Sequence, residues 1–132
     1  MNRQQIQLLK WILRIGTALT FTGHGLVALS VKYQWLTYLT AIGFTQQWAQ
    51  QLLPLIGILD LLVAGIILLR AYQAVVLWAV GWAFLTALIR PIAGEGWLAF
   101  VERGANWAVP LTLYLIQHYH KDHHSKQNIP KR

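Results

Sequence analysis

The sequence predicts an all-α integral membrane protein, a four-helix bundle formed by a single domain over residues 1–132. The first observation behind this prediction is composition. Hydrophobic residues make up 56% of the chain and charged residues only 11%, whereas soluble domains carry about a quarter charged residues. The second is a succession of four long apolar stretches, and only helices or closed barrels can satisfy their backbone hydrogen bonds in lipid.

The four apolar stretches give the positions of the predicted spans, since a helix needs about 20 apolar residues to cross a bilayer. We place the spans at residues 11–30, 52–69, 74–90 and 104–119. Only Arg70 to Gln73 separate the second span from the third, which predicts an antiparallel hairpin. An alternative for the first stretch is a cleaved signal peptide ending near Ser30, although Arg14 and His24 interrupt its apolar run.

The two longer links differ in composition. The first, residues 31–51, contains aromatic and aliphatic residues at helical spacing, which predicts a short helix lying in the headgroup region, with an irregular loop as the alternative. These residues are Trp35, Leu36, Tyr38, Leu39 and Ile42. The link between the third and fourth spans instead holds Pro91, Gly94 and Gly96, which stop helices.

The positive charges predict an orientation, because cytoplasmic segments carry an excess of lysine and arginine. One end of the predicted bundle collects Arg3, Lys10, Arg14, Arg70, Lys121, Lys126, Lys131 and Arg132. The other end collects Lys32, Arg90 and Arg103. We therefore expect both termini in the cytoplasm, with a basic cytoplasmic tail over residues 120–132, and the bacterial inner membrane as the location.

Several kinds of chemistry are excluded by composition. The chain has no cysteine, so it cannot itself hold covalent haem, Cys-ligated zinc, an iron–sulfur cluster or a thiol relay. Its net charge of +7 follows the span ends rather than a basic stripe, so nucleic acid is not an expected partner. The tail residues His120 and His124 could bind a metal if helical, but a solvated tail is the simpler interpretation, and we predict no metal site.

Ionisable residues inside a span are costly, so each is a candidate functional residue. His24 and Asp60 lie at similar depth in the outer halves of the first two spans, where they could pair and handle protons as candidate catalytic residues; Asp60 could instead pair with Arg90. The structural alternatives are a histidine in a packing seam and a polar clamp between helices. At the outer end the topology gathers further candidate ligand-binding residues: Arg90, Glu95, Glu102, Arg103 and Asn106.

Some of these residues give the chain a resemblance to the DoxX-like family of small four-helix bacterial and archaeal membrane proteins. That family's first helix typically has an Arg, a Gly and a His-Gly pair. A Gly-aromatic step and an acid–Gly–Arg order follow. The matching residues are Arg14, Gly16, His24, Gly25, Gly43, Phe44, Asp60, Gly65 and Arg70. The family includes the small subunit of a thiosulfate:quinone oxidoreductase, so the resemblance implies a link to quinone-coupled redox work.

Three functions remain open from the sequence. The first is a membrane subunit of an oxidoreductase that binds a quinone, with His24 and Asp60 handling protons and Arg90 or Arg103 holding a polar head; its electrons would come from a redox partner protein or a non-covalent cofactor. The second is a non-catalytic scaffold or assembly factor. The third is a small lipophilic-ligand binder or transporter, for which a narrow four-helix bundle would need to form a homo-oligomer. The lipid bilayer is a partner in all three.

Overall fold

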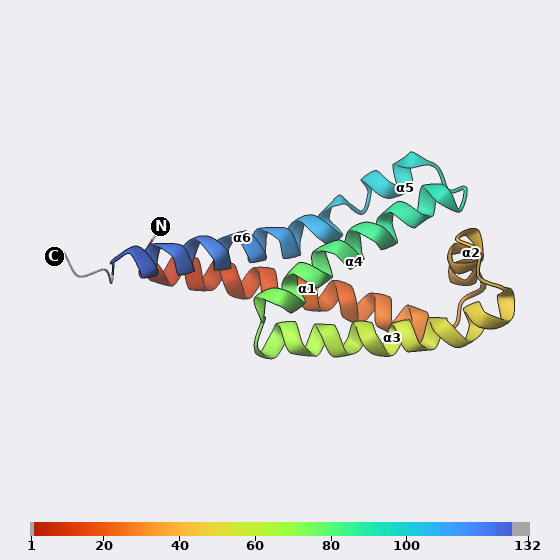
Figure 1. The fold of residues 1–132 in the computed structure, drawn as a ribbon, viewed down its shortest axis with the longest axis horizontal. Helices are drawn as coiled ribbons and strands as arrows, with labels where there is room; N and C mark the ends of the chain where they lie inside the picture. Colours follow the sequence, from red (N-terminus) through yellow and green to blue (C-terminus); the bar gives the residue numbers. More distant parts are fainter. Residues whose placement is uncertain (1, 128–132) are drawn as a thin grey trace.

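The protein is described by a computed structural model, which gives the backbone of residues 2–127 and the side chains of residues 2–119. This part of the chain consists of helices joined by turns (Figure 1). The helices are α1 (Arg3–Leu29), α2 (Tyr33–Ala41), α3 (Gln46–Leu69), α4 (Gln73–Ile92), α5 (Trp97–Val101) and α6 (Gly104–Gln127). The predicted all-α class is thereby confirmed.

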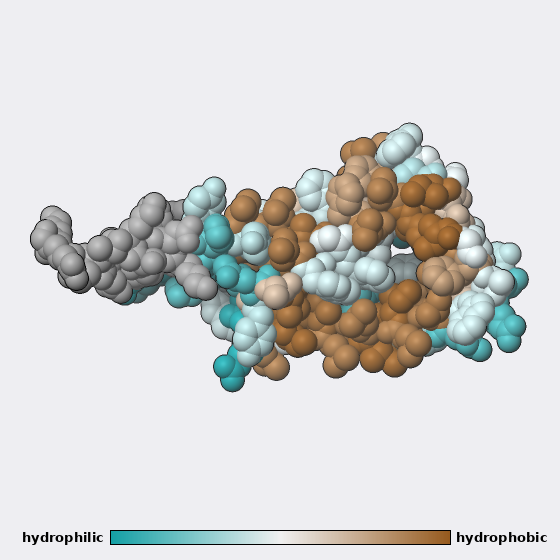
Figure 2. All heavy atoms as spheres, viewed as in Figure 1, coloured by the Kyte–Doolittle hydropathy of each residue, from teal (hydrophilic) through white to brown (hydrophobic). Residues whose placement is uncertain are grey.

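Three of these helices, α1, α3 and α4, are long and apolar enough to cross a membrane. Their surfaces agree with this, because large apolar side chains such as Leu19, Leu62 and Leu77 point outward and are at least half exposed. Figure 2 shows apolar side chains over the middle of the molecule and hydrophilic ones toward its two ends. In water, each Å² of this exposed apolar surface would cost about 25 cal/mol of free energy. Lipid is therefore the medium that this surface fits.

The fourth predicted span lies in α6, which packs against α4 and α1. This helix does not meet the same length and hydropathy test within the described residues. Its polar C-terminal half accounts for this, since the helix continues to Gln127 rather than ending at residue 119. A bundle with four membrane spans therefore stays a prediction. The side chains of the tail histidines His120, His123 and His124 lie outside the described residues.

The closest helix contact joins α1 to α3 at a pair of glycines. A β-carbon on Gly25 would lie 2.8 Å from the carbonyl oxygen of Gly57, and one on Gly57 would lie 2.8 Å from the carbonyl oxygen of Gly25. Both distances are too short for a side chain. Small residues at helix crossings let backbones approach in membrane proteins, where packing replaces the hydrophobic effect as the driving force.

Beyond this crossing, the far end of α3 is fixed by polar contacts from α1 and α6. The Arg14 guanidinium donates hydrogen bonds to the backbone carbonyls of Ile67 and Leu68, which are among the carbonyls that a helix C-terminus leaves unpaired. The Gln117 side chain donates to the carbonyl of Ala71, at 2.9 Å, in the turn between α3 and α4. These contacts hold α1, α6 and the turn together at one level of the bundle.

The helices α3 and α4 form the predicted hairpin, but they touch each other little beyond their shared turn. Each instead has a different main partner, α1 for α3 and α6 for α4. Figure 1 shows the two pairs diverging from the turn toward the end where α2 and α5 lie. This divergence opens a wedge between the pairs, and α2 lies across its wide end.

Several predicted boundaries were correct only approximately. The predicted short helix in residues 31–51 is present as α2, but α5 was not predicted, because its five residues are too few to show a helical period. Pro91 does not stop α4, which continues to Ile92. The chain reverses afterwards, at Gly94 and Gly96, whose φ angles of 97° and 83° are accessible to glycine at little cost.

The glycine crossing predicts a large difference between two conservative substitutions on α3. Gly57→Ala should destabilise the protein by about 1–3 kcal/mol, as overpacking of a tight contact does. Gly65→Ala should be neutral or stabilising by up to about 1 kcal/mol, since alanine favours the helix and nothing lies within 4 Å of its added β-carbon. Thermal unfolding of both variants in detergent, followed by circular dichroism, measures this. Equal melting temperatures would contradict the close crossing.

Candidate functional site

A pocket of about 310 Å³ occupies the wedge between the two helix pairs. Figure 2 shows a hollow on this face toward the end of the molecule that carries α2. Helices α1, α2, α3 and α4 all contribute to the lining, and most of it is apolar. The apolar lining residues are Trp35, Leu39, Ile42, Leu53, Ile56, Trp82, Leu85, Leu88, Ile89 and Ile92. We call this space the inner pocket.

Four of the predicted site residues line the inner pocket, although they come from four different segments. His24 comes from α1, Asp60 from α3, Arg90 from the end of α4, and Arg103 from the turn before α6. The fold therefore brings together residues that are up to 79 positions apart, counted from His24 to Arg103. Their roles in binding or proton transfer stay predictions, but their common location gives those roles one site.

Asp60 is the most deeply buried ionisable residue of this site, with 2% of its surface exposed. Its Oδ1 atom has no hydrogen-bond partner in the described part of the chain, and neither does the indole Nε1 of Trp82. Both residues line the inner pocket. Buried polar atoms are nearly always paired with protein or water, and leaving one unpaired costs about 1–3 kcal/mol. The Trp82 side chain interacts with the Asp60 carboxyl, but Nε1 and Oδ1 do not form a hydrogen bond of normal geometry, so a polar group in the cavity could pair with both atoms.

The expected partners of Asp60 are engaged elsewhere. The His24 ring packs edge-on against Trp35, with 5.8 Å between ring centroids, and Arg90 forms an ion pair with Glu95. Neither the His24–Asp60 pair nor the Asp60–Arg90 pair forms among the described residues. His24 and Asp60 lie on the closely packed helices α1 and α3, but the His24 ring packs against Trp35 of α2 instead of Asp60. Arg90 lies across the wedge, at the end of α4.

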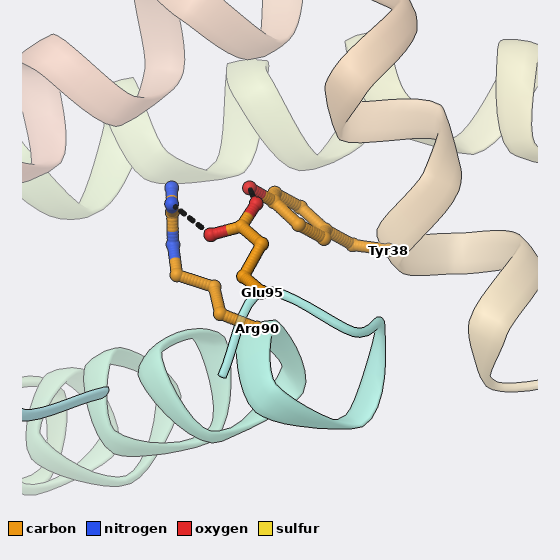
Figure 3. Close-up of polar contacts among 3 residues, drawn as sticks. All are labelled: Tyr38, Arg90 and Glu95. Carbon is orange, nitrogen blue, oxygen red and sulfur yellow. Dashed lines mark hydrogen bonds and ion pairs between the residues drawn. The ribbon is translucent and has the colours of Figure 1, made fainter. Parts of the chain in front are cut away.

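Three polar residues contact one another at the edge of the inner pocket, as Figure 3 shows, and we call Tyr38, Arg90 and Glu95 the mouth cluster. Glu95, in the turn after α4, accepts a hydrogen bond from the Tyr38 hydroxyl of α2 and forms an ion pair with Arg90 at 3.0 Å. The Arg90 guanidinium also lies 5.0 Å from the centre of the Tyr38 ring, within the range of a cation–π contact. These contacts fasten α2 to the end of α4 across the wedge.

The electrostatics of this cluster favour a charged Glu95. The hydrogen bond from Tyr38 and the positive charges of Arg90 and Arg103 hold the pKa of the Glu95 carboxyl below its ordinary value, even though Glu95 is exposed. Burial and the same hydrogen bond raise the pKa of the Tyr38 phenol, so that it stays a hydrogen-bond donor at neutral pH.

A second, more polar pocket of about 470 Å³ lies outside this mouth. We call it the outer pocket. It shares four residues with the inner pocket: Trp35, Tyr38, Arg90 and Arg103. The remaining lining includes Lys32, Gln34, Thr37 and Glu95. The polar mouth cluster therefore forms a common wall between an apolar pocket at the level of the spans and a polar one at the end of the bundle.

Two predicted site residues lie away from both pockets. Glu102 is exposed at the end of α5, and Asn106 is half-buried in the first turn of α6. Neither lines the inner or the outer pocket. Of this stretch only Arg103, between α5 and α6, reaches the pockets.

Tyr38, Trp82 and Lys32 line these pockets but were not among the predicted site residues. Tyr38 belongs to the short helix that the sequence predicts in the headgroup region, where no site residue was expected. A better signal was available for Trp82, because it shares a helical face with Thr86 and Arg90, and all three line the inner pocket. No group of three or more histidines, cysteines or acids that could hold a metal occurs among the described residues.

No family model matches the sequence, and comparison with curated proteins and with solved structures found no match. The resemblance to the DoxX-like family therefore stays a prediction. The geometry of the pockets is the basis on which a function can be inferred.

The mouth cluster predicts acid-sensitive attachment of α2. Because the folded-state pKa of Glu95 is lowered, its contribution is present above the ordinary glutamate value of about 4.3 and is lost as pH falls through the lower folded value. Hydrogen-exchange protection of residues 33–41, corrected for intrinsic exchange, should fall on acidification of the wild-type protein. Glu95→Gln should have low protection already at pH 7 and change little with acid.

The exposed acid Glu102, replaced by Gln, is the matched control for this experiment. Its variant should follow the wild type at every pH. If residues 33–41 of Glu95→Gln were protected from hydrogen exchange at pH 7 as strongly as in the wild type, the cluster would not fasten α2.

Proposed function

We propose that this chain is an integral membrane protein of the DoxX-like type that binds a lipophilic molecule in the inner pocket, with a quinone as the first candidate ligand. The observation behind the proposal is the buried Asp60 carboxyl, which faces an apolar pocket without a partner for its Oδ1 atom. A pocket with apolar walls and a few polar groups of this kind is the usual form of a small-molecule site.

A quinone suits the chemistry of the pocket. Its flat ring matches a lining that contains the aromatic side chains of Trp35 and Trp82. Its carbonyl oxygens need hydrogen-bond donors, and the Trp82 N–H, the neutral form of Asp60 and His24 are all available. Reduction of a quinone to a quinol takes up two protons with two electrons, so a carboxyl and an imidazole in the pocket are suitable proton donors.

In this proposal the chain is a membrane subunit, because it has no cysteine to hold a redox centre. A partner protein or a non-covalent cofactor would deliver the electrons. A non-redox binder or transporter of another lipophilic ligand would use the same pocket. A scaffold does not require a pocket, and a buried carboxyl without a partner for its Oδ1 atom would only destabilise it.

The topology is part of the proposal. With α1, α3, α4 and α6 all crossing, the chain would cross four times and return both termini to the cytoplasm of a bacterial inner membrane. The arrangement of the helices supports this, because Arg3, Lys10 and Arg14 lie in the first half of α1, and Arg14 contacts the last turn of α3, beside Arg70. Lys32 and Arg103 lie at the other end, which would face outward.

The function of Asp60 is tested by Asp60→Leu. Removal of a buried, unpaired carboxyl should raise the melting temperature or leave it unchanged, because an apolar side chain of similar size suits this site. Binding of decylubiquinone, followed by quenching of tryptophan fluorescence in detergent, should weaken about tenfold, which corresponds to about 1.4 kcal/mol. Asp60→Asn keeps a donor and should bind closer to the wild type.

The matched control is Thr112→Val, an isosteric change on the exposed face of α6 and outside both pockets. It should bind decylubiquinone as the wild type does. A destabilised Asp60→Leu variant would instead identify Asp60 as a structural clamp. A stable variant with wild-type affinity would exclude a role for Asp60 in binding.

A further inference from the structure

The outer pocket carries an excess of positive charge. Three cationic side chains line it, those of Lys32, Arg90 and Arg103, against the single carboxylate of Glu95. Glu95 is already engaged by Arg90 and Tyr38. Its negative charge therefore neutralises Arg90, while the charges of the other two cations stay unbalanced within this pocket.

Arg103 shows the imbalance most clearly. Its Nε atom is buried without a hydrogen-bond partner, and its guanidinium has no ion pair among the described residues. Burial and the neighbouring Arg90 lower the pKa of Arg103, which reflects the free-energy cost of holding the charge there. An unpaired N–H and two like charges side by side are a costly arrangement in the folded protein.

An anion in the outer pocket would remove both costs. A guanidinium presents several N–H donors in one plane and binds oxyanions in a bidentate manner. Lys32 supplies a further ammonium from the turn before α2, and the exposed side chains of Gln34 and Thr37 on α2 add neutral polar groups to the lining. The volume of about 470 Å³ leaves room for a group with several oxygens.

We propose that the outer pocket binds a phosphate-like oxyanion through Arg103 and Lys32, with Arg90 as a third cation. This site goes beyond the proposed function, because it is separate from the apolar space beneath it and needs no lipophilic ligand. Two sources of the same chemistry fit its position at the end of the bundle. One is a free anion from the aqueous side, and the other is the phosphate head group of an anionic lipid.

The test uses the full chain in phosphatidylcholine nanodiscs. Inorganic phosphate is titrated at constant ionic strength, and binding is followed by calorimetry. Phosphatidylglycerol is then added at defined mole fractions, and retained lipid is counted by native mass spectrometry. Saturable phosphate binding assigns the site to a free anion, whereas saturable phosphatidylglycerol binding without phosphate binding assigns it to a lipid head group.

Two variants decide whether the proposed residues form the site. Arg103→Gln should weaken binding of the successful probe at least tenfold, while Arg3→Gln, which removes an exposed charge at the opposite end of α1, should bind as the wild type does. Arg103→Lys keeps the charge and should recover part of the affinity. Loss of an unpaired buried charge should not lower the melting temperature of Arg103→Gln.

Failure of this proposal is distinguishable from failure of the quinone proposal. Asp60→Leu should keep its affinity for the anionic probe. Lys32 lines only the outer pocket, so Lys32→Gln should weaken binding of the anionic probe but keep its affinity for decylubiquinone within about twofold, a difference of about 0.4 kcal/mol. The anion site is overturned if neither phosphate nor phosphatidylglycerol binds the wild type saturably, or if Arg103→Gln and wild type bind alike.

Discussion

The site depends on the close contact between α1 and α3 at Gly25 and Gly57. This crossing brings the backbones together just where His24 and Asp60 lie, one residue before the first glycine and three after the second. Since α3 follows α1 closely and α4 follows α6, the short turn at Ala71 has to join two pairs that lean apart. The inner pocket is the space that this geometry leaves.

A cavity of this kind would weaken a water-soluble protein. At its wide end, Leu36 and Leu39 of α2 pack in an apolar cluster with α1 and α3, while polar contacts join α2 to the end of α4. Tyr38, Glu95 and Arg90 join α2 to the end of α4 with a hydrogen bond, an ion pair and a cation–π contact. Exposed ion pairs usually contribute little to stability, but the Arg90 side chain is only 13% exposed. The cluster therefore combines a charge contact with partial burial, and it separates the two pockets.

Much of the fold could be predicted from apolar periodicity and from the cost of unpaired backbone groups in lipid. The helical class, the three apolar helices and the short helix in residues 31–51 follow from those two principles. The length of α6 and the existence of α5 do not, because a polar helix end and a five-residue helix leave no periodic signal. The sequence predicted where individual polar residues lie better than it predicted which side chains they contact. Asp60 and His24 line one pocket as expected, but they do not pair, because His24 packs against Trp35 of α2, and no local pattern encodes the position of α2 relative to α1.

The pairing of the helices has a consequence for how the protein is made. Both α1 and α4 have the next long helix in the chain as their main neighbour, but a short helix stands between the partners: α2 separates α1 from α3, and α5 separates α4 from α6. As the chain leaves the ribosome, the first pair can assemble in the bilayer while the second is still being synthesised. The inner pocket forms only after α4 and Arg103 have been synthesised and the second pair docks against the first, so a chain that ends after α3 would hold Asp60 on a lipid-facing surface.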